Sequence, residues 1–184
     1  MSTNAWLWLL AVLGTAAGVA LAVLAQWRGR PALALPALLP AGVGVLVQAG
    51  NLTRPAPAHA WVVVLSAAVV ALAVVAGSPI TTWVLQRTDP PSTAGPTGGI
   101  IVGGRADGET EILRGGTTIG YLERFAVVGA AAVGRFEIVA AVIAIKGLGR
   151  FTELSSSIAR ERFIIGTLVS LLWAGLCAAL IWPY

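Results

Sequence analysis

Two uninterrupted apolar segments constrain this chain more than any other feature of its sequence. The first runs from Ala5 to Gln26 and the second from Trp61 to Val84. A helix rises ~1.5 Å per residue, so each segment is long enough to cross the ~30 Å hydrocarbon core of a bilayer. Tryptophans stand at both ends of each segment, where a spanning helix meets the two membrane interfaces. The sequence therefore predicts an integral membrane protein.

The composition supports this prediction and excludes several other classes. Hydrophobic residues make up 57% of the 184 residues and charged residues only 11%, whereas soluble domains carry about 25% charge. The net charge of +4 comes from arginines that flank apolar segments, so we expect no nucleic-acid partner. With one cysteine, Cys177, and one histidine, His59, the chain lacks an intrachain disulfide and the usual zinc motifs. We predict no catalytic, metal-binding or cofactor-binding residues and no cofactor.

Three parts are expected along the chain. Residues 1–85 form an N-terminal three-helix membrane segment, whose middle helix is interrupted by Pro36 and Pro40. Residues 86–118 are rich in Gly, Pro, Ser and Thr and are expected to form a flexible polar cytoplasmic loop, in which residues 100–102 and 111–113 can pair as a short hairpin. Residues 119–184 form a charged hairpin and a final transmembrane helix.

The charged hairpin is the most informative of these parts. Ten of the chain's twenty charged residues lie between Ile119 and Thr167, among otherwise apolar residues. If the chain reverses at Gly134–Phe136, then Glu123, Arg124 and Lys146 reach a common level roughly 16 Å from the turn. An isolated charge at that depth costs ~2.5 to 3.5 kcal/mol. We therefore expect Glu123 to pair with Lys146 and Arg124 to turn toward another helix, the cytoplasmic interface or a lipid phosphate.

A continuous helix from Phe125 to Ile145 is the alternative to the hairpin. It would carry Arg150, Arg160 and Arg162 to the side opposite Arg28 and Arg30, whereas the hairpin keeps all five on one side. The positive-inside rule favours the hairpin, which gives about six membrane segments with both termini outside. Because the two arms are short, a re-entrant loop that enters and leaves from the cytoplasm is also compatible with the sequence.

Two further features concern contacts of the C-terminal part. Arg150, Arg160 and Arg162 are candidate contacts for anionic lipids, with a solvated cluster that only sets orientation as the simpler interpretation. The final helix carries small residues at four-residue spacing, a pattern that favours close helix packing. They are Gly166, Ser170, Ala174 and Ala178.

Four short patterns resemble a known family. IGYLER at 119–124, GRFE at 134–137, KGLGRF at 146–151 and ERFIIGT at 161–167 are similar to the C-terminal part of an uncharacterised family of small bacterial multi-pass membrane proteins. The resemblance covers about a third of the chain. It implies a helical bundle in the bacterial inner membrane and brings no activity with it.

Three functions are compatible with these residues. The first is a non-enzymatic membrane subunit or scaffold, whose partners are membrane lipids and other membrane helices or a second copy of the chain. The second is a small transporter or channel that uses the cluster of Glu123, Arg124 and Lys146. The third is a protein that binds or modifies lipid headgroups. The sequence favours the first, because it contains no metal set, nucleophile elbow or paired carboxylates.

Overall fold

The chain forms an all-α bundle in a computed structural model that describes residues 3–88, 101–102, 110–111, 116–151 and 157–181. The elements are α1 (Thr3–Trp27), a 3-10 helix η1 (Pro31–Ala37), α2 (Leu38–Ala49), α3 (His59–Thr88), β1 (Ile101–Val102), β2 (Thr110–Glu111), α4 (Gly116–Ala132), α5 (Phe136–Phe151) and α6 (Ser157–Ala179). The two strands pair antiparallel, with Ile101 opposite Glu111. The first strand falls within the expected range 100–102, and the second begins one residue before the expected range 111–113. The turn between them lies outside the described residues.

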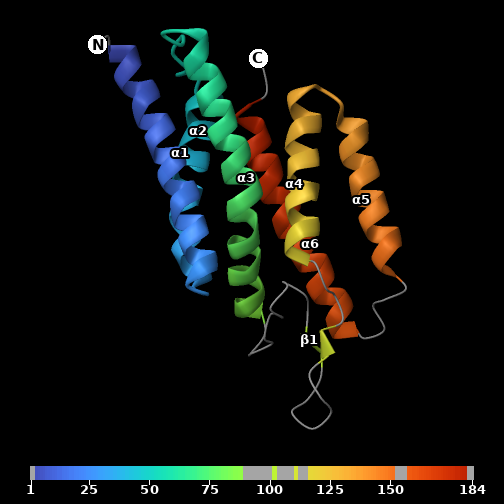
Figure 1. Ribbon diagram of the computed structural model, residues 1–184. Coiled ribbons are helices and arrows are strands. Elements are labelled where there is room, and N and C mark those ends of the chain that lie inside the picture. Colours follow the sequence, from blue (N-terminus) through green and yellow to red (C-terminus); the bar gives the residue numbers. More distant parts are fainter. Residues whose placement is uncertain (1–2, 89–100, 103–109, 112–115, 152–156, 182–184) are drawn as a thin grey trace.

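The helices run alternately up and down the bundle (Figure 1). The N-terminus, the α2–α3 connection, the α4–α5 connection and the C-terminal end of α6 all lie at one end, and β1 and β2 lie beyond the other. Four helical stretches are long and apolar enough to cross a membrane: Asn4–Trp27, Pro31–Ala49, His59–Thr88 and Arg160–Ala179. The chain is thus a helical protein suited to a membrane, as its composition predicts.

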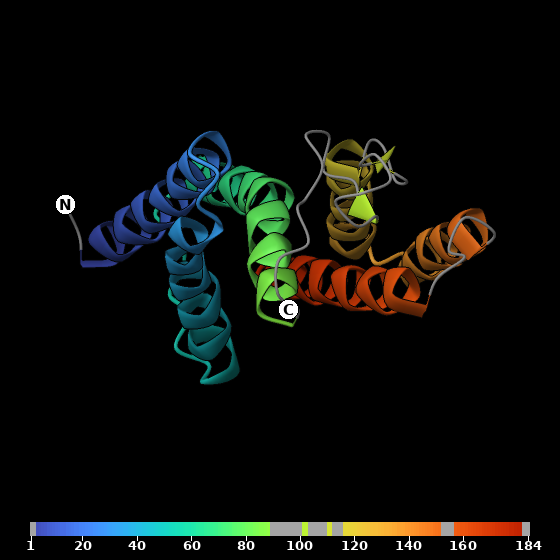
Figure 2. The same cartoon turned by 90° about the horizontal axis from the view of Figure 1, so that it is seen from below.

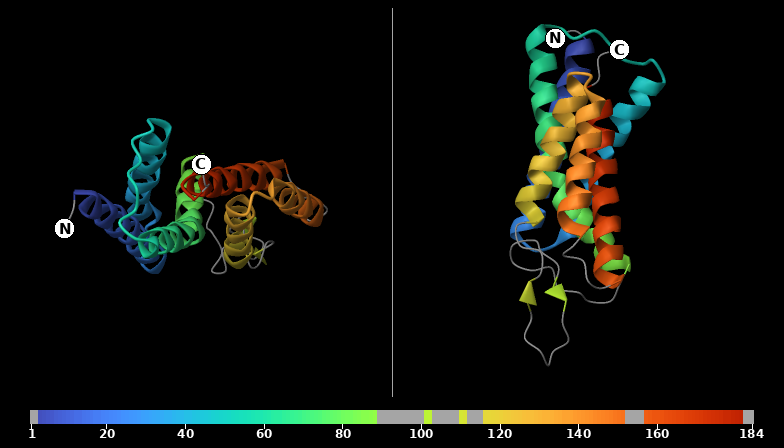
Figure 3. Two further views of the ribbon diagram at one scale, coloured as in Figure 1. Left: turned by 90° about the horizontal axis from the view of Figure 1, so that it is seen from above. Right: turned by 90° about the vertical axis from the view of Figure 1, so that its right-hand side faces the viewer.

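The helix α3 is the centre of the bundle. It packs against α1, η1, α4 and α6, and its buried residues Leu72, Ala73 and Ala76 belong to the main apolar core. Viewed along the bundle axis, α1 and α5 lie at opposite margins of an open arrangement (Figures 2 and 3). Of the two, α5 is the less anchored, because α4 is its principal neighbour.

Prolines shape two of the membrane segments. The segment that begins at Pro31 starts as 3-10 helix and becomes α-helix only at Leu38, as expected for a segment that contains Pro36. In α3, Pro79 lies inside a continuous helix. Because proline has no backbone N–H, the carbonyl of Val75 cannot receive its helical hydrogen bond. That carbonyl becomes part of the polar site described below.

The chain reversal occurs where the sequence predicts it. The helix α4 ends at Ala132 and α5 begins at Phe136, so a straight helix from Phe125 to Ile145 is excluded. Gly134 has a φ of 69°, a left-handed conformation that glycine adopts without strain. Its N–H bonds to the carbonyl of Ala131 and that of Arg135 to the carbonyl of Ala130, which together form a Schellman C-cap.

The small residues of the final helix mark its packing face. Ser170, Ala174 and Ala178 are buried, and a side-chain carbon at Gly166 would lie 3.5 Å from Thr81 and Leu85 of α3. This face contacts α3 as well as α4, so the neighbours of α6 include the hairpin and the central helix.

Candidate functional site

The structure brings Glu123 and Lys146 together across the hairpin. Lys146 Nζ donates to Glu123 Oε2 over 2.5 Å, and the two side chains are 10% exposed for the acid and 17% for the amine. Lys146 Nζ also lies 5.8 Å from the centre of the Phe163 ring. Lys146 thus links α5 to the acid of α4 and to an aromatic ring of α6.

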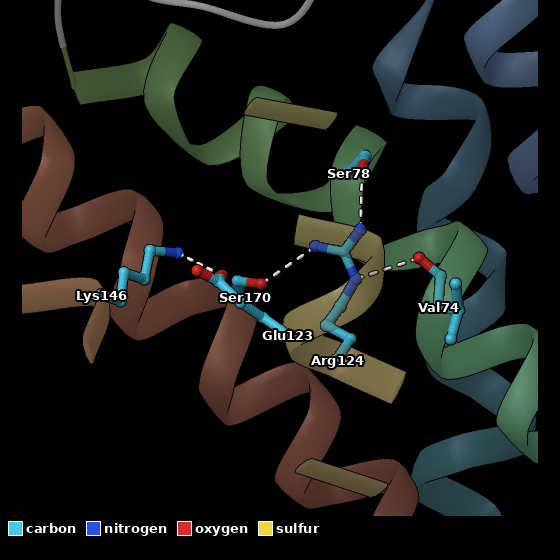
Figure 4. A network of polar contacts seen from close by, with 6 residues as sticks. All are labelled: Val74, Ser78, Glu123, Arg124, Lys146 and Ser170. Atoms are coloured by element: carbon cyan, nitrogen blue, oxygen red, sulfur yellow. Dashed lines mark hydrogen bonds and ion pairs between the residues drawn. The ribbon is translucent and has the colours of Figure 1, made fainter. Parts of the chain in front are cut away.

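Arg124, the next residue after Glu123, points away from this pair toward α3 (Figure 4). It is only 2% exposed. Its Nε donates to the carbonyl of Val74 over 3.0 Å, its Nη1 to Ser170 Oγ over 2.9 Å and its Nη2 to Ser78 Oγ over 2.7 Å. All three acceptors are uncharged. Among the described residues, no carboxylate forms an ion pair with Arg124, so a buried cation is held by neutral groups of two other helices.

Two glycines make room for the guanidinium. A side-chain carbon added at Gly77 would lie 2.5 Å from Arg124 Nε and closer still to Cδ. One added at Gly120 would lie 3.1 Å from Nη1. Any larger residue at Gly77 must therefore displace Arg124. The cluster of Gly77, Gly120, Ser78, Ser170 and the Val74 carbonyl is named the Arg124 socket here.

A second set of polar contacts joins α1 to the same region. Gln26 Nε2 donates to the carbonyl of Val75 over 2.9 Å, and Tyr121 donates from its hydroxyl to Gln26 Oε1 over 2.6 Å. The Tyr121 ring in turn lies 5.5 Å from the guanidinium carbon of Arg124. Val75 is the residue whose carbonyl Pro79 leaves without a helical donor, so Gln26 replaces that donor.

Three successive carbonyls of α3 accept side-chain donors from three different helices. Ala73 accepts from Trp173 Nε1 of α6 over 3.1 Å, Val74 accepts from Arg124 of α4, and Val75 accepts from Gln26 of α1. The turn of α3 just before Pro79 is therefore the point where α1, α4 and α6 are each joined to the central helix by a polar bond.

The basic residues expected to contact lipids have different surroundings. Arg160 is exposed, whereas Arg162 is 9% exposed and lies four residues before Gly166, on the packing face of α6. The side chain of Arg150 lies outside the described residues. At the hairpin tip, Arg135 Nη1 bonds Glu137 Oε1 over 3.2 Å, with both side chains largely exposed.

These contacts include no cluster of metal-binding side chains among the described residues. Within that part of the chain, no group of three His, Cys, Asp or Glu side chains is placed to hold a metal ion. Comparisons with family models, curated proteins and solved structures found no match. The chemistry of the site must therefore be inferred from its own polar contacts. These contacts join helices to one another.

Proposed function

We propose that this is a multi-pass protein of the bacterial inner membrane that acts as a non-enzymatic subunit or scaffold. One observation carries the proposal: the charged side chains of Glu123, Arg124 and Lys146 inside the bundle all bond to groups of the same chain. Glu123 and Lys146 pair with each other, and Arg124 bonds to α3 and α6. Buried charges of this kind fix the positions of helices, and these bonds occupy the groups that a substrate would otherwise bind.

The proposed orientation places both termini on the outer side. Arg28, Arg30 and Arg87 lie at the end of the bundle that would face the cytoplasm, as the positive-inside rule requires. At the opposite end, Arg135 is offset by Glu137. The hairpin then crosses the membrane, with its tip outside.

Partner helices would bind at the margins of the bundle. Ile145 and Leu148 of α5 and Leu10 of α1 are more than 60% exposed, and lipid, other helices or a second copy of the chain can cover them. Because α5 rests mainly on α4, a partner on its free side would extend the bundle.

Two measurements test the proposal, the first of them topology. In a Cys177→Ala background, single cysteines at Arg135 and Arg28 should react differently with a membrane-impermeant thiol reagent applied to intact cells. We expect labelling at position 135 without permeabilisation and at position 28 only after it. The reverse pattern would invert the orientation, and equal labelling of both would contradict a crossing hairpin.

The second measurement is co-purification from native membranes in mild detergent. A scaffold should carry a stoichiometric membrane partner or form a defined oligomer. A monodisperse monomer without a partner, together with transport activity of the pure protein in vesicles, would contradict the scaffold function and support the transporter. That alternative is favoured by one observation: Lys146 lies on the loosely anchored α5, whose movement would open the ion pair.

A further inference from the structure

A surface cavity of about 510 Å³ lies where the end of α1 and the start of η1 meet the last turns of α3. Arg30 lines it from the connection between α1 and η1, and Trp83, Gln86 and Arg87 line it from α3. This cavity is separate from the Arg124 socket and shares no residue with it. It is named the Arg30–Arg87 pocket here.

The charges of the pocket are unbalanced. Among the described residues, its lining contains two arginines and no acidic side chain. Both arginines are exposed, and within the described part of the chain neither guanidinium has an ion-pair partner. A concave surface with two guanidiniums that have no ion-pair partner favours an anion that can accept several hydrogen bonds at once.

Local structure orients the side chain of Arg87 and the backbone of Arg30. The guanidinium carbon of Arg87 lies 4.5 Å from the centre of the Trp83 ring, so stacking fixes one face of the group and leaves its N–H edge available. Gly29 has a φ of 59° and, with Arg30, caps the end of α1 by bonds to Gln26 and Ala25. The backbone that carries Arg30 is therefore fixed by a defined turn.

The level of the pocket indicates where its anion comes from. Trp27, two residues before Gly29, is 85% exposed, and Trp83 lines the pocket itself. Tryptophans are enriched where helices leave the hydrocarbon for the headgroup region. Basic pockets between helices at that level, on the cytoplasmic side, suit phosphate-bearing headgroups.

We propose that the Arg30–Arg87 pocket binds the phosphate group of an anionic phospholipid. The two guanidiniums hold the phosphate oxygens, and the adjoining apolar surface of α1 and α3 accommodates the acyl chains. This inference rests on the proposed membrane location and, through the cytoplasmic side of the pocket, on the proposed orientation, but not on the scaffold function. Its failure would therefore leave the topology and partner experiments unaffected.

Lipid binding to the purified full-length chain tests the proposal. The protein is delipidated in an uncharged detergent and titrated with phosphatidylglycerol, phosphatidylcholine or inorganic phosphate, and bound molecules are counted by native mass spectrometry. We expect one phosphatidylglycerol to bind at least about tenfold more tightly than phosphatidylcholine, whose choline group offsets the phosphate charge. Arg30→Gln and Arg87→Gln should each weaken that binding about tenfold, the effect of losing one charge-assisted contact.

Arg28→Gln is the matched control, because it removes the same charge from the same end of the bundle outside the pocket. It should change the affinity for phosphatidylglycerol less than about twofold. Equal losses of affinity for phosphatidylglycerol in all three variants would show general electrostatic attraction and overturn the proposed binding site. Binding of inorganic phosphate but not of phosphatidylglycerol, with the same dependence on Arg30 and Arg87, would overturn the lipid assignment in favour of a soluble phosphate.

A purely structural role makes a different prediction. Arg87 lies in the last turn of α3, where a positive charge complements the helix dipole, and Arg30 lies three residues past the end of α1. If that were their whole role, the two substitutions would lower the unfolding temperature and leave lipid affinity unchanged. This result would also overturn the proposal.

Discussion

Gln26 of α1 donates a hydrogen bond from Nε2 to the carbonyl oxygen of Val75 in α3, across 2.9 Å. Val75 lies four residues before Pro79, which has no N–H to offer it. The proline-containing helix therefore completes its hydrogen bonding with a side chain from its neighbour. A proline would weaken an isolated helix. Here it leaves the Val75 carbonyl oxygen available as an acceptor for a neighbouring helix.

Gln26→Leu should lower the free energy of unfolding by about 1 kcal/mol, because the Val75 carbonyl loses its donor. In a Pro79→Ala background, the new alanine supplies the helical N–H, and the same Gln26 substitution should cost less. The cost of the Gln26 substitution in each background can be measured by unfolding the protein in mixtures of mild detergent and dodecyl sulfate. Tryptophan fluorescence reports the unfolding. Tyr121→Phe, which removes only the bond to Gln26, is the control. Equal costs in the two backgrounds would contradict the coupling.

Lys146→Met should destabilise the protein by roughly 3 kcal/mol, because it leaves the Glu123 carboxylate buried without its partner. Replacing both residues, with Glu123→Leu added, should recover most of that loss. The double-mutant cycle is measured by the same detergent titration. If the double variant loses as much free energy of unfolding as the two single variants together, the two residues do not act as a pair.

Gly77→Ala should destabilise the protein by at least about 2 kcal/mol, because the added carbon forces Arg124 out of its socket and away from its acceptors. Gly129→Ala is the matched control, since a carbon there meets no atom within 4 Å. Alanine is the better helix former by about 1 kcal/mol, so the control should be neutral or stabilising. Thermal unfolding followed by circular dichroism shows whether each substitution raises or lowers the stability. A Gly77→Ala variant as stable as the original protein would contradict the close packing of Arg124 against Gly77.

Arg124→Lys should be more damaging than Arg124→Met, by at least about 1 kcal/mol. Lysine keeps the cost of a buried cation but cannot reach acceptors on α3 and α6 at once. Methionine removes the charge, and Ser78 and Ser170 can then bond to carbonyls of their own helices. Free energies of unfolding for the two variants decide the matter. The opposite order would indicate that the positive charge itself is required.

The sequence predicts the hairpin and the Glu123–Lys146 pair because both follow from the number of residues between each side chain and the turn. Glycine at 134 sets the turn, and equal distances along two antiparallel helices place Glu123 opposite Lys146. The three-helix N-terminal part follows in the same way from apolar length, although α3 extends beyond both predicted ends, to His59 and Thr88.

The partners of Arg124 could not be predicted by such counting. They depend on which faces of α3 and α6 meet α4, and lipid-facing helices of nearly uniform hydrophobicity do not reveal their packing faces. Two signals were nevertheless present: the Gly77-Ser78-Pro79 sequence, and the small-residue stripe that contains Ser170. Each of them contributes one of the two hydroxyls that the guanidinium bonds.

The contribution of Ser170 to the Arg124 socket imposes an order on the biogenesis of the protein. Glu123 and Lys146 belong to one hairpin, so they can neutralise each other as soon as α5 has been synthesised. Arg124 must wait for α6, the last of these helices to leave the ribosome, before its third acceptor is in place. A chain interrupted before α6 thus carries a guanidinium that lacks its Ser170 acceptor.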